Sequence, residues 1–257
     1  MSIINSRWGR LVHLALAADL EDPNFAPEAF TGLYQRSLYQ SMRSQTRRMS
    51  ELLHERLASL PEAYRAEAAA LLQRQDEILT RQGALLKHKV NATRTRHHGD
   101  YHLGQVLNTG RDFCIIDFEG EPGFSFSERR LKKSPFKDVA GMMRSFHYAA
   151  FGKIVLNENY REKDIEFLEQ WAEQWQHYAS RFYLGAYMEK LGIGPELSDE
   201  NEILIRTFLL EKAVYELGYE LNGRPDWVNI PLRGIHYLMQ RYALAKDEKK
   251  KVKAKAE

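Results

Sequence analysis

Apolar residues recur at intervals of three and four along most of the chain, which is the spacing of helices that bury one face. This spacing predicts helices over residues 7–18, 27–60 and 61–86, and a further series of long helices from residue 138 onward. Pro61 suits the first turn of the third helix because its missing N–H costs nothing there. The chain is therefore expected to be mainly α-helical.

A different pattern begins after residue 96. Two short apolar runs, 106–107 and 113–118, flank a glycine-containing segment at 108–110, and this arrangement predicts a small β-hairpin. Residues 119–135 contain several glycines and prolines, which indicates a loop. The hairpin and the loop interrupt an otherwise helical chain, so they are the natural place to look for chemistry.

Large aromatic residues lie on one face of the long helix expected around residue 175. They are Phe167, Trp171, Trp175, Tyr178 and Phe182, at intervals of three and four. One interpretation is that this face binds a cofactor. A face directed at the protein core is the favoured one.

Composition limits the size and surroundings of the protein. The chain has 257 residues, of which 44% are hydrophobic, enough for one large domain or two small ones. The pattern divides it into a helical first half at 1–96, a loop, hairpin and helices at 97–245, and a basic tail at 246–257. A tail of this composition cannot bury apolar surface, so it is predicted to be disordered.

Charge and cysteine content argue against several classes of partner. A net charge of +2 gives no overall attraction to nucleic acid or to an anionic membrane. The single cysteine, Cys114, excludes an internal disulfide, and its apolar neighbours predict a small buried side chain. No apolar stretch is long enough to span a bilayer and no signal-peptide pattern opens the chain, so a cytoplasmic location is expected.

Three oxygen-bearing side chains form the strongest chemical signal. Asp100 and Gln105 lie five residues apart in the segment 98–107, and Asp117 ends the second apolar run. Phosphoryl transfer to an alcohol needs a carboxylate beside the attacking hydroxyl and oxygen ligands for Mg²⁺. Because the hairpin would return Asp117 to the loop, the three groups are predicted to converge on one metal ion. The alternative is that both aspartates only cap turns or accept backbone N–H groups.

The same segments carry a family resemblance. HGDYHLGQVL at 98–107, IIDFEGEP at 115–122 and DVAGMMRSFHYAAF at 138–151 resemble the catalytic-loop region of the aminoglycoside phosphotransferase-like kinases. More narrowly, they resemble the maltokinase group, including the kinase region fused to trehalose synthase. LVHLALA at 11–17 and the segment 211–235 extend the likeness to nearly the whole chain.

The resemblance implies a fold and an activity. The fold would be the C-terminal lobe of a protein-kinase-like structure of the aminoglycoside phosphotransferase type, with the N-terminal, nucleotide-clamping lobe absent. The activity would be transfer of a phosphoryl group from ATP, with Mg²⁺, to maltose. Without the N-lobe, little or no activity is expected of this polypeptide alone. Its partners would be the sugar and an N-lobe or trehalose synthase supplied in cis or in trans.

The resemblance also implies residue roles. Asp100 would be the catalytic aspartate. Gln105 and Asp117 would hold Mg²⁺, with Glu119 as a further contributor. His98 and Asp138 would shape and brace the loop rather than touch substrate.

A second polar group is placed at the sugar site. Lys212, Tyr215, Glu216 and Tyr219 share one helix face, at i, i+3, i+4 and i+7. By spacing alone this is a Lys212–Glu216 surface pair worth a few tenths of a kcal/mol. The family likeness places sugar contacts on this helix and so favours binding by the first three residues. Tyr219 and Arg144 receive no role.

Two further hypotheses stay open. The chain could be a non-catalytic helical module, or half of a split kinase. It could also be a kinase-like lobe for another small alcohol, such as an aminosugar or an aminoglycoside, because the loop residues do not distinguish acceptors.

Overall fold

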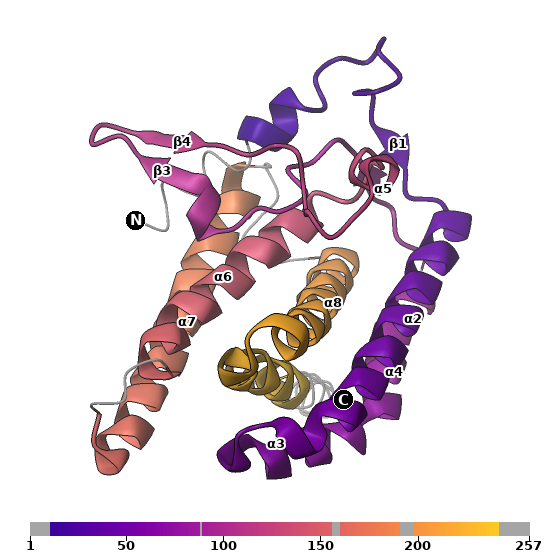
Figure 1. Ribbon diagram of the computed structural model, residues 1–257. Coiled ribbons are helices and arrows are strands. Elements are labelled where there is room, and N and C mark those ends of the chain that lie inside the picture. Colours follow the sequence, from indigo (N-terminus) through magenta and orange to yellow (C-terminus); the bar gives the residue numbers. More distant parts are fainter. Residues whose placement is uncertain (1–10, 88, 156–159, 191–197, 242–257) are drawn as a thin grey trace, which may run out of the picture.

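The computed structural model describes residues 11–87, 89–155, 160–190 and 198–241, and it is mostly helical (Figure 1). The longer helices are α2 (Gly32–Arg56), α3 (Glu62–Leu72), α4 (Gln75–Gln82), α6 (Phe136–Val155), α7 (Glu162–Lys190) and α8 (Asp199–Gly223). A short α5 (Phe126–Arg129) lies in the loop region, and residues 11–15 and 229–241 are also helical. The prediction of a mainly α protein is confirmed.

Helix boundaries follow local capping chemistry. Thr31 caps α2 and Ser198 caps α8, because each side chain accepts the backbone N–H three residues further on. The single helix predicted over 61–86 is wrong: α3 and α4 are separated by a break at residues 73–74, and a 3₁₀ turn follows α4. Apolar periodicity continues across such a break, so the pattern alone could not reveal it.

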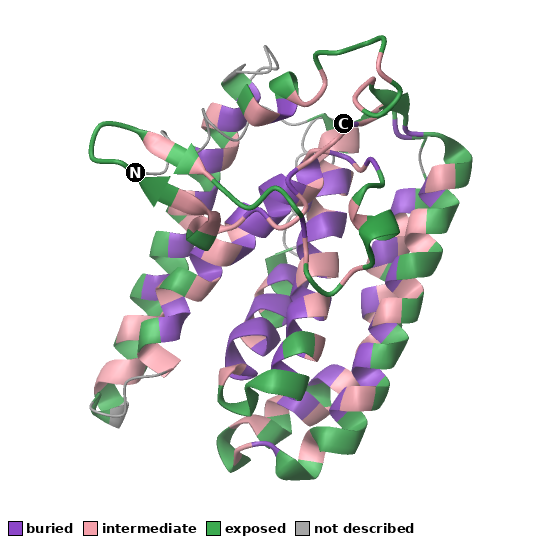
Figure 2. Cartoon of the chain, turned by 45° about the horizontal axis from the view of Figure 1, so that its top comes forward, coloured by how far each residue is buried: buried purple, intermediate pink, exposed green. Residues whose placement is uncertain are grey.

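The long helices are arranged side by side in the order α7, α6, α8, α2, α4 (Figure 1). Their buried stripes face one another across one main core (Figure 2). Members of this core from successive helices are fully or almost fully buried: Met42, Leu53, Ile78, Met142, Tyr183, Phe208, Ala213 and Leu217. Helices α6 and α8 lie in the middle of this order, and both carry residues of the candidate site.

Two small antiparallel sheets accompany the helices. The predicted hairpin is confirmed as β3 (Val106–Asn108) paired with β4 (Phe113–Ile115). A second pair, β1 (Glu28–Ala29) with β2 (Thr93–Arg94), joins segments far apart in sequence and was not predicted. The expectation that Cys114 is buried is wrong, since its side chain is exposed on the hairpin. Side chains alternate between the two faces of a strand, so Phe113 and Ile115 are partly buried and Cys114 between them points to the outside.

The aromatic face of α7 is directed at solvent rather than at the core. Its five members, Phe167, Trp171, Trp175, Tyr178 and Phe182, are each between 51% and 62% exposed. The face that packs on the molecule is smaller and more polar, and consists of Ala172, Gln176, Ser180, Tyr183, Tyr187 and Met188. The interpretation of the stripe as a core face is therefore wrong.

The basic tail at 246–257 lies outside the described residues. Among the helices of the described segments, none combines the length and the apolar character that crossing a bilayer requires.

Candidate active site

The segment that begins at His98 is held against α6 by a buried carboxylate. Asp138, in the first turn of α6, accepts the backbone N–H of His98 at 2.7 Å and that of Gly99 at 3.0 Å. The imidazole Nε2 of His13 lies 2.9 Å from the same carboxylate, and its Nδ1 lies 2.8 Å from the hydroxyl of Tyr187. The geometry is what the predicted bracing role of Asp138 requires.

Electrostatics keep this carboxylate ionised. Burial opposes the charge, but the hydrogen bond from His13, the nearby His97 and the N–H of Gly99 hold the pKa of Asp138 well below its usual range. A carboxylate that accepts several N–H groups in a buried position fixes the backbone that donates them.

Two further contacts hold the loop against the same face of α6. A side chain at Gly141 would bring its Cβ to 2.8 Å from the carbonyl oxygen of Tyr101, so only glycine permits this approach. One turn further, the hydroxyl of Ser145 accepts the backbone N–H of Leu103 at 3.2 Å. Asp138, Gly141 and Ser145 thus contact the loop at successive turns of one helix.

His98 connects the loop to the strand that leads to Asp117. Its Nε2 donates to the carbonyl of Ile116 at 2.8 Å, and its Nδ1 accepts the N–H of Asp100 at 3.3 Å. Gly99 adopts φ +90°, and a Cβ there would lie 3.0 Å from the Cα of Gly120. The two backbone segments therefore touch at glycines, which is what brings the loop and the β4 exit together.

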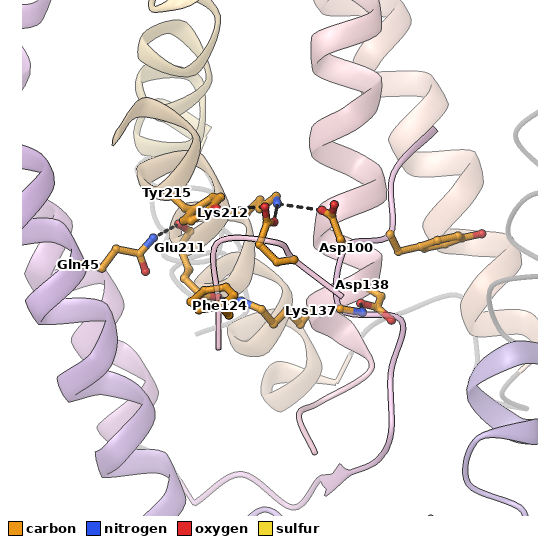
Figure 3. Close-up of a pocket in the computed structure, with 12 residues that line it drawn as sticks. Gln45, Asp100, Phe124, Lys137, Asp138, Glu211, Lys212 and Tyr215 are labelled. Atoms are coloured by element: carbon orange, nitrogen blue, oxygen red, sulfur yellow. Dashed lines mark hydrogen bonds and ion pairs between the residues drawn. The ribbon is translucent and has the colours of Figure 1, made fainter. Parts of the chain in front are cut away.

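A charged network surrounds Asp100 (Figure 3). The ammonium of Lys212, from α8, lies 2.7 Å from Glu121 Oε2 and 3.5 Å from Asp100 Oδ1. Tyr215 donates its hydroxyl to Glu121 Oε1 at 3.0 Å, and His102 Nε2 lies 3.5 Å from Asp100 Oδ2. The helix predicted to bind the acceptor therefore meets the loop directly.

The network shifts the titration of its members in opposite directions. Burial raises the pKa of Asp100, but His102 and Lys212 outweigh it and hold that pKa well below its usual range. Burial lowers the pKa of Lys212, yet the carboxylates of Glu121 and Asp100 raise it above its ordinary value. Asp100 is therefore a carboxylate and Lys212 an ammonium at neutral pH.

The predicted metal ligands lie beside one another at the base of the hairpin. Gln105 donates its side-chain N–H to Asp117 Oδ2 at 2.8 Å. Asp117 adopts φ +64°, a left-handed conformation that is uncommon outside glycine and clusters at functional sites. Glu119 is exposed, and its nearest charged group is Arg129 at 3.9 Å. The carboxylate of Asp100 interacts instead with Lys212, His102 and Glu121.

These donors suit Mg²⁺. Across the described segments, no three His, Cys, Asp or Glu side chains converge in a metal-binding arrangement. Mg²⁺ is commonly held by one or two carboxylates and by substrate phosphates rather than by an all-protein cage. The carboxylate of Asp117 and the amide oxygen of Gln105 supply hard oxygen ligands of that kind.

A cleft of about 470 Å³ opens beside Asp100, between the loop, α6 and α8. Its lining is rich in acids and rings: Asp100, His102, Glu121, Tyr148, Lys212, Tyr215, Glu216, Tyr219, Glu220 and Arg224. The three residues predicted to bind the acceptor, Lys212, Tyr215 and Glu216, all line it. The volume is within the usual range for a small-molecule site.

Glu216 is not a free carboxylate in this cleft. Its Oε2 lies 2.8 Å from Nε of Arg144 and 2.6 Å from the same guanidinium's terminal nitrogen, and both side chains are almost completely buried. Tyr148 on α6 likewise donates to Glu220 on α8 at 3.0 Å. Arg144, which received no role from the sequence, therefore links α6 to Glu216 on α8.

Two acids of the cleft escaped sequence-based assignment. Glu121 follows the hairpin within the quoted IIDFEGEP segment, and its partners Lys212 and Tyr215 lie more than 90 residues away. Glu220 continues the i, i+4 spacing of Glu216 on the same helix. That spacing was the available signal for Glu220, whereas no local pattern reveals the pairing of Glu121.

Comparison with known proteins shows which fold this is. No protein-family model matches the chain. It is similar to a glucosamine kinase of Streptacidiphilus jiangxiensis, with 28% identity over 186 residues that cover 72% of this chain and 40% of the relative. A glucosamine kinase of Mycolicibacterium smegmatis is 29% identical over 135 residues, which cover 52% of this chain and 32% of the relative. The chain thus spans less than half the length of the curated relatives it matches.

Solved structures agree with the sequence comparison. A glucosamine kinase in complex with glucosamine, ADP and inorganic phosphate superimposes with a TM-score of 0.73 at 22% identity, over 95% of this chain and 56% of that one. Crystal form A of glucosamine kinase gives the same TM-score over 95% of this chain and 55% of the other. The described fold is therefore shared with part of a sugar kinase, and in particular with glucosamine kinases.

The identification with the maltokinase group is corrected by these findings. The matching relatives and structures are glucosamine kinases, a different group of sugar kinases. They give no support to a trehalose synthase partner, to a missing N-lobe as a partner, or to an aminoglycoside phosphotransferase-type lobe. The likeness to the maltokinase group was drawn over nearly the whole chain, and it still did not separate one sugar-kinase group from another.

Proposed function

We propose that this chain forms the acceptor-binding and catalytic-loop part of an ATP-dependent kinase, and that its acceptor is an aminosugar such as glucosamine. The observation that carries the proposal is the cleft beside Asp100, which is lined by four carboxylates and by tyrosine rings. An aminosugar offers a cation and several hydroxyl groups, and carboxylates bind both. Tyrosine rings suit the apolar face of a sugar and add cation–π attraction.

Asp100 is the residue proposed to face the attacking hydroxyl. Its depressed pKa makes it a weak base, so its first contribution is to accept a hydrogen bond and orient the hydroxyl. It takes the hydroxyl proton as the new O–P bond forms and the bond between the γ-phosphorus and the bridging oxygen breaks, with ADP as the leaving group. Lys212 keeps this carboxylate ionised and joins it to Glu121. Both effects position the nucleophile, which is the main requirement in phosphoryl transfer.

Gln105 and Asp117 are proposed to hold Mg²⁺ at the base of the hairpin, with Glu119 as an outer ligand. A bound Mg²⁺ would supply neutralisation of charge on the transferred phosphate. The role of the chain's own residues is to present two oxygen donors, one before β3 and one after β4. The hydrogen bond between Gln105 and Asp117 fixes their separation.

A direct binding measurement tests the aminosugar assignment. Titration calorimetry with glucosamine is expected to show one site, and N-acetylglucosamine, glucose and maltose are expected to bind at least about tenfold more weakly. Charged hydrogen bonds are worth about 1.5–3 kcal/mol each, or roughly ten- to hundredfold in affinity. Glu121→Gln should therefore weaken glucosamine binding by about that factor and leave glucose binding nearly unchanged.

Glu128→Gln is the matched control, because Glu128 forms a capping box on the exposed α5 and lies away from the cleft. It should leave all four affinities unchanged. Equal affinity for glucose and glucosamine would refute the aminosugar assignment. Failure of every sugar to bind would refute the acceptor cleft itself.

A further inference from the structure

The exposed aromatic face of α7 is the largest feature that the proposed function does not use. Trp171, Trp175, Tyr178 and Phe182 are each at least half exposed, on the outer side of a 29-residue helix. Figure 1 shows α7 at the edge of the helical array, with α6 on its inner side. Apolar groups gathered on one exposed face mark an interaction surface more often than a scatter of single residues does.

The spacing of these four residues is symmetric. Their intervals are four, three and four, so the set reads the same in both directions about a point between residues 176 and 177. Intervals of three and four are also those of helices that pair along a seam. A helix with such a face is complementary to an antiparallel copy of itself, because a twofold axis at that point places Trp171 opposite Phe182 and Trp175 opposite Tyr178.

We infer that α7 is the interface of a homodimer, in which two copies of this chain pair through antiparallel α7 helices. Side chains beside the seam permit this approach. Ala179 and Ala186 are small and partly exposed, and Gln174 falls next to Arg181 of the second copy. Phe167 extends the aromatic seam at each end, where it faces Ala186 of the second copy.

The area is sufficient for a specific pair. Large aromatic side chains bury roughly 150–250 Å² each, so five that are about half exposed offer about 500 Å² per copy. Two copies together would bury about 1,000 Å², which is the minimum expected of a specific interface. Neighbouring side chains on the seam add to this area. The dimer is therefore expected to dissociate within a measurable concentration range rather than to be permanent.

Sedimentation velocity over a concentration series tests the proposal. The wild-type chain is expected to shift from monomer to dimer in the micromolar range. Trp171→Glu should raise the dissociation constant at least about a hundredfold, since it places a charge in the seam of both copies. Phe126→Glu is the control: Phe126 is 78% exposed on α5, outside the stripe, and its substitution should leave the dissociation constant unchanged. Thermal melts of both variants establish that they are folded.

Cysteine cross-linking tests the antiparallel register independently of Trp171→Glu. In a Cys114→Ser background, chains that carry Trp171→Cys are mixed with chains that carry Phe182→Cys, under mild oxidation. A disulfide between the two kinds of chain is expected, and each kind alone should cross-link weakly. Self-cross-linking of Trp171→Cys chains as strong as cross-linking in the mixture would refute the antiparallel pair. A wild-type chain that stays monomeric up to about 100 µM would refute the dimer altogether, since association is expected in the micromolar range.

Discussion

Replacing Asp138 by asparagine is expected to weaken the attachment of the loop backbone to α6 without changing side-chain size. The carboxylate of Asp138 accepts the N–H groups of His98 and Gly99 and lies against His13 Nε2. An asparagine oxygen can replace one of the two carboxylate oxygens. The asparagine NH₂ group then faces a donor, so at least one buried N–H loses its acceptor.

The expected cost follows from these contacts. A buried donor left without a partner costs about 1–3 kcal/mol, and hydrogen bonds to a charged group are stronger than neutral ones. Asp138→Asn should therefore lower the free energy of unfolding by about 2–4 kcal/mol at pH 7. Because the folded-state pKa is depressed, the aspartate contributes stability above its unfolded pKa, about 3.9, and loses it as the pH falls below that value. The difference between wild type and variant should shrink below about pH 4.

Urea unfolding, followed by circular dichroism at several pH values, measures this difference. Asp164→Asn serves as the matched control, because Asp164 pairs with Arg161 on an exposed part of α7. Its effect should stay within about 0.5 kcal/mol, as for other surface ion pairs. An Asp138→Asn variant as stable as Asp164→Asn would show that the carboxylate does not hold the loop.

Three further predictions concern the region around α6. Gly234→Ala should destabilise the protein by about 1–3 kcal/mol, because the new Cβ would lie 2.2 Å from the buried guanidinium of Arg144. Gly185→Ala, in open space on α7, should instead stabilise it by about 0.5–1 kcal/mol, and thermal melts of the two variants measure the difference. Glu216→Leu alone should cost about 3–5 kcal/mol, and adding Arg144→Met should recover most of this in urea unfolding, because the lone buried charge is removed. Burial holds the pKa of His147 well below 6.5, so below about pH 6.5 the unfolded chain binds more protons than the folded chain. The free energy of unfolding should therefore fall as the pH is lowered from about 6.5. His147→Gln should make this fall less steep, as measured by thermal melts at several pH values.

Sequence reasoning succeeded where the signal is local. Helical periodicity located most of the helices, and two apolar runs around a glycine located the hairpin. The spacing of Asp100, Gln105 and Asp117 directed attention to the segment that borders the cleft. Each of these inferences needs only residues that are near one another in the chain, where backbone geometry limits the outcome.

Sequence reasoning failed where the outcome depends on distant partners. Periodicity defines an aromatic face on α7 but does not say which face the rest of the chain will cover. Helix α6 packs against Tyr183 and its neighbours, so Trp171 on the other side stays exposed. Glu121 pairs with Lys212 from α8, and no short-range pattern records a contact between residues so far apart. The choice between sugar-kinase groups failed for the related reason that loop motifs are shared among acceptors.

Helix α6 contacts both the loop that carries Asp100 and the acids of α8 that line the cleft. Asp138, Gly141 and Ser145 meet the loop backbone, while Arg144 and Tyr148 reach across to acids on α8. The two sets lie on adjoining faces of a single rigid element, so the loop cannot shift along α6 without losing contacts made at three successive turns. The acids of α8 are placed by the same helix. The position of Asp100 beside the cleft therefore depends on α6 more than on the loop's own residues. Preorganisation of this kind is what the proposed phosphoryl transfer would require.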